Sequence, residues 1–192
     1  MLGRQAKTIS QPTLRRMLAY ARRTRTPKRD QVIVLLSVKA GLRACEIAAL
    51  EWPMVLNGNG EVGDLIELRA TIAKHQSGRR IPMHPQLKEA LTRLLREQRS
   101  SEGPVIVSTR RGRMRANSIV NWFVAIFAEL TLEGCSSHSG RRTFITAAAR
   151  NVHRTGGSLR DVQVLAGHRS IETTQRYIDG DTRSQRRLVA ML

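Results

Sequence analysis

Apolar positions recur along most of the chain at the spacing of amphipathic helices. The stretch QPTLRRMLAYARR, from Gln11, has this spacing and predicts a basic helix. The stretch TPKRDQVIVLLSVKAG predicts a core helix, because Thr26 suits an N-cap, Pro27 the first helical position and Gly41 the stop. Four more helices are expected in LRACEIAALEW, after His84–Pro85, from about Asn117, and in RTFITAAAR.

Two further patterns complete the predicted fold. NGNGEVGD, residues 57–64, is rich in turn-forming residues, and LIELRATIAK and RRIPM flank HQSG as the two strands of a hairpin. In SLRD, Ser158 and Asp161 stand at the spacing of a helix-capping pair, and Gly167 suits the end of that helix. We therefore predict a mainly α fold with a small antiparallel β-sheet (α+β).

Composition predicts one globular domain. The 192 residues are 41% hydrophobic and 25% charged, which suits a single domain over residues 11–192 after a flexible N-terminal arm, residues 1–10. The longest apolar run begins at Val32 and is far shorter than a membrane span, and the first ten residues lack the apolar core of a signal peptide. We expect no membrane association and a cytoplasmic protein.

Cysteine and histidine usage gives no sign of a bound metal. Cys45 and Cys135 are too few and too far apart for a disulfide framework, which favours a reducing compartment. His75, His84 and His153 lack a cluster with ligand spacing, so neither a zinc site nor any cofactor is expected.

The charge of the chain indicates a polyanionic partner. Lysine and arginine number 33 against 15 acidic residues, a formal net charge of +18, and 28 of the 33 are arginine. Arginine suits bidentate phosphate contacts. A GC-rich genome would explain arginine over lysine but not the twofold excess of base over acid. Nucleic acid is therefore the expected partner, with an anionic membrane surface as the weaker alternative.

Five motifs occur in a recognisable order: GLRACEIAAL, AKHQSGRRIPM, HSGRRTF, LAGHRS and TTQRYI. In order and spacing they resemble the tyrosine recombinases, the phage integrase family, from about Lys28 to Asp179. The resemblance implies the catalytic-domain fold of that family and site-specific cleavage and rejoining of double-stranded DNA. The reaction would pass through a 3′-phosphotyrosyl intermediate without metal or ATP.

By this resemblance, six residues carry the chemistry: Arg43, Lys74, His138, Arg141, His168 and Tyr177. Arg43 and Arg141 would clamp the non-bridging oxygens of the phosphate, whose negative charge grows in the pentacoordinate state. Glu46 matches a carboxylate that supports the arginine. Taken singly, each residue is more often a surface or core residue, and only the ordered set is specific.

Proton transfer falls to the remaining residues. Tyr177, with an ordinary pKa of about 10, is a weak nucleophile at neutral pH, and His138 matches its base or proton shuttle. Lys74 matches the general acid for the departing 5′-oxygen, and His168 matches a hydrogen-bond donor to the phosphate. Further candidates for DNA contact are His75, Arg79, Arg80, Arg142 and Arg169.

Two features depart from the family pattern. Gly140 stands where relatives usually carry a leucine, and the chain has no room for the N-terminal core-binding domain that closes over DNA. The chain is then a cut-down version of a longer protein, a minimal recombinase, or one whose clamp comes from a partner or accessory protein. We expect a monomer in solution that assembles on nucleoid DNA as a homo-oligomer, a tetrameric synapse.

Several alternatives stay open. The C-terminal segment, residues 184–192, either docks on a neighbouring protomer or folds back on its own domain. The alternative function from another class is a catalytically silent DNA-binding module. A type IB topoisomerase, which nicks and reseals one strand, is a lesser alternative.

Overall fold

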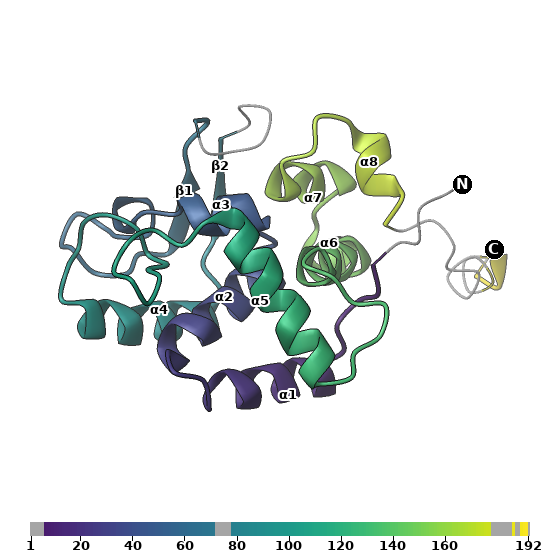
Figure 1. Cartoon of the computed structure of the whole chain (residues 1–192). Coiled ribbons are helices and arrows are strands. Elements are labelled where there is room, and N and C mark those ends of the chain that lie inside the picture. Colours follow the sequence, from purple (N-terminus) through teal and green to yellow (C-terminus); the bar gives the residue numbers. More distant parts are fainter. Residues whose placement is uncertain (1–5, 72–77, 178–185, 187–188, 192) are drawn as a thin grey trace. The chain divides into compact units, whose positions relative to one another are not determined.

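The computed structural model describes residues 6–71, 78–177, 186 and 189–191 (Figure 1). The chain divides into two compact units, unit 1 (Met1–Phe144) and unit 2 (Ile145–Leu192). The prediction of a single domain over residues 11–192 stays a prediction. Within the described part of the chain, no helix is both long and apolar enough to cross a membrane.

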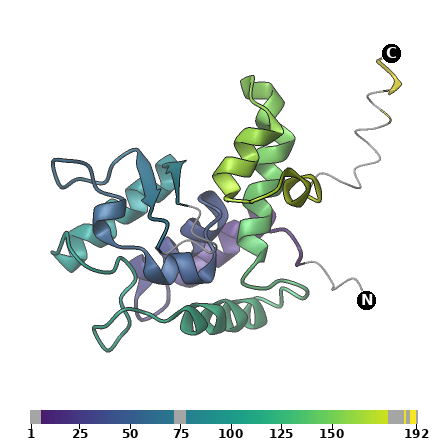
Figure 2. The ribbon, with the colours of Figure 1, turned by 90° about the horizontal axis from the view of Figure 1, so that it is seen from above.

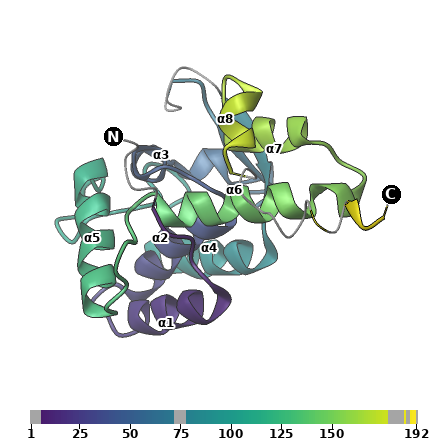
Figure 3. The same cartoon turned by 90° about the vertical axis from the view of Figure 1, so that its right-hand side faces the viewer.

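Unit 1 is mainly helical. Its helices are α1 (Gln11–Ala21), α2 (Pro27–Lys39), α3 (Ala44–Ala49), α4 (Pro85–Gln98) and α5 (Ala116–Glu129), with a 3-10 turn η1 (Trp52–Met54) and the start of α6 (Ser139–Asn151). The central helix is α2, which packs against α1, α3 and α4, while α3 also packs against α5 (Figure 3). Every residue of α2 from Val32 to Val38 is buried, which confirms it as a core helix.

Helix starts and stops follow the predicted residues. Pro27 opens α2 after Thr26, and the chain leaves that helix through Ala40 into Gly41, whose φ is +65°. Pro85 opens α4, and the Nδ1 atom of His84 accepts a hydrogen bond from the backbone N–H of Gln86 at 3.2 Å. These local signals therefore place the helices correctly.

The predicted hairpin is a two-stranded antiparallel sheet, β1 (Leu65–Leu68) with β2 (Arg79–Pro82) (Figures 1 and 2). Ile66 pairs with Ile81 and Leu68 with Arg79, and these four residues are buried while their neighbours along each strand are exposed. The helices and this sheet together confirm the predicted α+β class. Lys74 and His75 lie outside the described residues.

The flexible arm over residues 1–10 stays a prediction, and the structure describes residues 6–10 of it with contacts to the rest of unit 1. The backbone N–H of Lys7 donates to the carbonyl of Gly134 at 2.9 Å, and that of Ile9 donates to Oγ1 of Thr143 at 2.7 Å. Ile9 is buried and Ser10 caps α1. An apolar anchor and these hydrogen bonds hold the segment.

Unit 2 contains the rest of α6, a 3-10 turn η3 (Val152–Thr155), α7 (Leu159–Ala166) and α8 (Ile171–Gln175). Helix α7 packs against α8 (Figure 3). At the start of α7 the carboxylate of Asp161 accepts from the backbone N and the Oγ of Ser158, and Gly167 ends the helix with φ +63°. Both features were predicted. Most of the C-terminal segment, residues 184–192, lies outside the described residues.

Candidate active site

Gly41 shapes the loop that leads from α2 into α3. Its φ of +65° lies in the left-handed region, and a Cβ at this position would lie 2.4 Å from Cδ1 of Phe144. Its carbonyl oxygen accepts a hydrogen bond from Nη1 of Arg141 at 2.7 Å. Only glycine satisfies both the backbone angle and the close approach, and the resulting turn holds Arg141 against this loop.

Arg43 stands at the N-cap of α3 with extended backbone, φ −74° and ψ 157°. Glu46, three residues later, reaches back: its Oε2 accepts from the backbone N–H of Arg43 at 2.9 Å, and its Oε1 accepts from Nη1 of Arg43 at 2.9 Å. The predicted support of Arg43 by Glu46 is therefore present, with Arg43 placed just before the helix. The carboxylate also satisfies a backbone N–H at the helix start.

Arg79, which was predicted as a DNA contact, pairs with the same carboxylate. Its Nη1 and Nη2 donate to Oε1 and Oε2 of Glu46 at 2.9 and 3.0 Å, and its side chain is only 2% exposed. Burial leaves little of this guanidinium accessible in the structure, and its contact with DNA stays a prediction. The strand period gives the missed signal, because Arg79 lies two residues before Ile81 and so shares its inward face.

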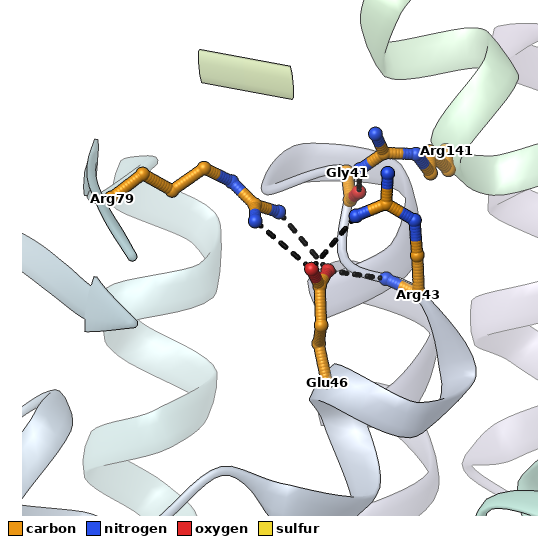
Figure 4. Close-up of polar contacts among 5 residues, drawn as sticks. All are labelled: Gly41, Arg43, Glu46, Arg79 and Arg141. Carbon is orange, nitrogen blue, oxygen red and sulfur yellow. Dashed lines mark hydrogen bonds and ion pairs between the residues drawn. The ribbon is translucent and has the colours of Figure 1, made fainter. Parts of the chain in front are cut away.

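Glu46 therefore receives four hydrogen bonds, two from each arginine (Figure 4). The residue is fully buried. Burial by itself raises the pKa of Glu46, but the hydrogen bonds and charge of Arg79, and then those of Arg43, lower it below its ordinary value. The carboxylate is thus charged at neutral pH and balances one of the two guanidinium charges.

Arg141 lies in the first turn of α6 and is buried except for about a twentieth of its surface. The residue before it, Gly140, stands where relatives usually carry a leucine, and the structure gives a reason for the glycine. A Cβ on Gly140 would lie 2.1 Å from Oγ and 3.1 Å from the backbone carbonyl carbon of Ser37. Glycine at this position lets the start of α6 approach α2 closely, and no larger side chain fits.

The other predicted residues of unit 1 lie nearer the surface. His138 is exposed just before α6, where its backbone N–H donates to Oγ of Ser136 at 3.2 Å and its carbonyl accepts from the backbone N–H of Arg142 at 2.9 Å. Arg142 is half-buried. Arg80 is exposed on β2 and pairs with Glu67 at 3.0 Å, so it keeps the accessibility that a DNA contact needs.

In unit 2 the structure brings His168 and Tyr177 together. Their rings stack with centroids 5.7 Å apart and an interplanar angle of 23°. Nδ1 of His168 lies 2.9 Å from Oγ1 of Thr174, which is fully buried, and the carbonyl of Thr174 accepts from the backbone N–H of Tyr177 at 3.1 Å. Thr174, which the sequence did not suggest, thus contacts both predicted catalytic residues.

The buried side chain of Gln163 stabilises the turn that carries His168. Nε2 of Gln163 donates to the carbonyls of His168 and Arg169 at 3.0 and 3.2 Å, and the backbone N–H of His168 donates back to the Gln163 carbonyl at 3.1 Å. These bonds close the turn after Gly167. The side chain of Arg169 is exposed, which suits its predicted DNA contact.

Comparison with known proteins gives a consistent result. A family model described as the phage integrase family matches residues 7–183. The tyrosine recombinase XerA of Thermococcus kodakarensis is 30% identical over 174 residues, which cover 89% of this chain and 57% of the relative. The tyrosine recombinase XerC of Syntrophus aciditrophicus is 26% identical over 159 residues, which cover 78% and 48%. The chain thus spans about half the length of these relatives.

The fold has counterparts among solved structures. A structure of the Tn1549 transposon integrase in complex with a circular intermediate DNA matches with a TM-score of 0.74 at 16% identity. The match covers 98% of this chain and 66% of that protein. At this identity the likeness concerns the fold, and it confirms the fold class predicted from the sequence.

Proposed function

Because the chain belongs to the phage integrase family, we propose that it cuts and rejoins DNA at specific sites through a covalent bond between Tyr177 and a 3′-phosphate. In this reaction the Tyr177 oxygen attacks the phosphorus, the bond to the 5′-oxygen breaks, and the departing oxygen takes up a proton. The reverse attack by a 5′-hydroxyl rejoins a strand and releases the tyrosine. The covalent intermediate conserves the bond energy, so no ATP is consumed.

The observation that carries the proposal is the anchoring of two arginines on one loop. Arg141 donates to the carbonyl of Gly41, two residues before Arg43, and Arg43 is held by Glu46 (Figure 4). Guanidinium groups fixed before substrate binds do not need to reorganise as charge develops on a phosphate. Two such groups match the non-bridging oxygens of a phosphodiester.

The proton carriers are assigned by chemistry. We assign His138 as the base or shuttle for the Tyr177 hydroxyl and Lys74 as the acid that protonates the 5′-oxygen. His168 donates a hydrogen bond to the phosphate. When Nδ1 of His168 accepts the hydroxyl proton of Thr174, Nε2 carries the proton and is the nitrogen that donates to the phosphate.

The proposed partner is double-stranded DNA. A net charge of +18 supports strong, salt-dependent binding to the phosphate backbone. The Tn1549 integrase, which is similar in fold, binds a circular intermediate DNA. We extend the proposal to a monomer in solution that assembles as a homo-oligomer on DNA at the nucleoid, with a tetramer as the synaptic form.

A nicked suicide duplex tests the reaction. The cleaved strand loses a short 5′-hydroxyl fragment and cannot be rejoined, so the covalent protein–DNA product accumulates. The duplexes are drawn from a pool of random sequence, incubated with the protein in EDTA and resolved on a denaturing gel. The chain contains two tyrosines, Tyr20 in α1 and Tyr177, so Tyr20→Phe is the matched control for Tyr177→Phe.

We expect a covalent band with the unmodified chain and with Tyr20→Phe, and none with Tyr177→Phe. A band that survives Tyr177→Phe would refute the assigned nucleophile. Strong DNA binding without any band would favour a silent DNA-binding module. Relaxation of a supercoiled plasmid that lacks any site recovered from the pool would favour a topoisomerase instead.

A further inference from the structure

Resting on the proposed function, we infer that Arg79 is a positioning residue: through Glu46 it holds the Arg43 guanidinium in the orientation that binds the scissile phosphate. Arg79 comes from β2, a strand distant in sequence from the loop that carries Arg43. Its side chain is buried. Its two hydrogen bonds to Glu46 connect it to Arg43 through the carboxylate.

The hydrogen-bond pattern fixes the carboxylate in space. Each oxygen of Glu46 accepts one N–H from Arg79 and one from Arg43: Oε1 from the two Nη1 atoms, and Oε2 from Nη2 of Arg79 and the backbone N of Arg43. The parallel pair of bonds from Arg79 prevents rotation of the carboxylate plane. The acceptor that Arg43 uses therefore has a fixed position (Figure 4).

Arg43 is anchored at one nitrogen and open at the others. Only its Nη1 bonds to Glu46, and its Nε and Nη2 make no hydrogen bond with another residue in the described ranges 6–71 and 78–177. Its side chain keeps 18% of its surface exposed. The anchored nitrogen sets the plane of the guanidinium, and the open nitrogens are the donors that a phosphate would meet.

The charge state of Glu46 makes this role measurable. Among the described residues, the charged groups that act on the buried carboxylate are Arg79 from β2 and Arg43 from the start of α3. Without the hydrogen bonds and charge of Arg79, the pKa of Glu46 would rise, because burial of the carboxylate raises it and only Arg43 would still lower it. Protonation would then remove an acceptor from Arg43, so the variant should lose more of its rate as the pH falls.

Single-turnover covalent capture on the suicide duplex, with protein in excess, tests the inference. At neutral pH we expect Arg79→Met to slow capture by about 10- to 100-fold, the effect typical of residues that orient a functional ligand. The ratio of the unmodified rate to the variant rate should grow as the pH falls from neutral into the acid range. Arg79→Lys keeps a charge but not the bidentate geometry, and should recover only part of the rate.

Two further variants separate positioning from folding and from charge. Arg80→Met removes the same charge from the exposed face of β2 and should leave the pH dependence of the rate ratio flat. Where Arg79→Met fails to fold, the double variant Arg79→Met with Glu46→Gln removes the unpaired buried charge. The inference expects this double variant to fold and still to capture DNA slowly, without the added pH dependence.

The inference is overturned if Arg79→Met folds and captures DNA at the unmodified rate with an unchanged pH profile, or if the double variant restores that rate. A measurement that does not require DNA cleavage can also refute the inference. Nitrogen-15 spectra of the DNA-free protein should show a slowly exchanging Arg43 guanidinium that becomes mobile in Arg79→Met. Absence of covalent capture by the unmodified chain would reject the proposed function, while an unchanged Arg43 signal would reject the role of Arg79.

Discussion

Replacing Gly41 with alanine tests the loop that joins the two arginines. The substitution forces alanine into a φ of +65° and places a methyl group 2.4 Å from Cδ1 of Phe144. The left-handed conformation costs about 1–2 kcal/mol for a non-glycine residue. Overpacking against the aromatic ring adds about 1–3 kcal/mol. We therefore expect a loss of about 2–5 kcal/mol, a large part of the roughly 5–15 kcal/mol by which domains are stable.

Two other glycines separate these contributions. Gly103 has a φ of +74° and Gly58 an ordinary φ, and neither has an atom within 4 Å of a Cβ built on it. Gly103→Ala should lose only the conformational part, about 1–2 kcal/mol. Gly58→Ala should be neutral, or stabilising by less than about 1 kcal/mol, because alanine restricts the unfolded chain.

Urea denaturation followed by tryptophan fluorescence measures these differences in the free energy of unfolding of unit 1. Both tryptophans, Trp52 and Trp122, belong to unit 1, and so do the three glycines. We also expect Gly41→Ala to slow covalent capture of DNA, because its carbonyl holds Arg141. A loss no greater than that of Gly103→Ala would refute the reasoning from the Phe144 contact.

Three further predictions use other contacts. Gly140→Ala gains helix propensity of about 1 kcal/mol but collides with Ser37 at an overpacking cost of about 1–3 kcal/mol, so tryptophan fluorescence in urea should report a net loss of up to about 2 kcal/mol. Thr174→Val removes the hydroxyl that contacts Nδ1 of His168, and should slow covalent capture about tenfold at a stability cost of about 1 kcal/mol. Hydrogen bonds from Ser158 lower the pKa of Asp161, so their contribution to α7 should be present above about pH 4 and lost as the pH falls below it, measured by amide exchange in α7.

Matched variants keep these results interpretable. Thr173→Val alters an exposed neighbouring threonine and should capture DNA at the unmodified rate. Asp161→Asn should abolish the acid loss of protection in α7, because the residue no longer titrates. A more stable Gly140→Ala, or equal capture rates for the two threonine variants, would contradict the packing and the hydrogen bond on which the predictions rest.

Local signals in the sequence were sufficient for most of the fold. Helix boundaries depend on signals that act within a few residues. Pro27 marked the start of α2, His84 the start of α4 and Gly167 the end of α7. The two strands of the hairpin were also predicted from the sequence. These elements depend on neighbours in sequence rather than on tertiary packing.

The candidate site was predicted less completely, because its supports are distant in sequence. The adjacent arginines of β2 differ in burial, since Arg79 faces inward and Arg80 outward. The two-residue period of a strand could have predicted this difference. The reason for Gly140 could not be predicted, since it depends on how closely α6 approaches Ser37 in α2. No local pattern encodes that distance.

The carboxylate shared by Arg43 and Arg79 limits how this chain can change over evolutionary time. Removing one member of a buried ion pair leaves a charge unpaired and costs about 3–5 kcal/mol, whereas exchanging all members for apolar residues of similar volume is often neutral or stabilising. Glu46 and Arg79, the two buried members, can therefore change only together. We expect relatives that have lost the carboxylate at position 46 to have lost the guanidinium at position 79 as well, and chains that keep one to keep the other.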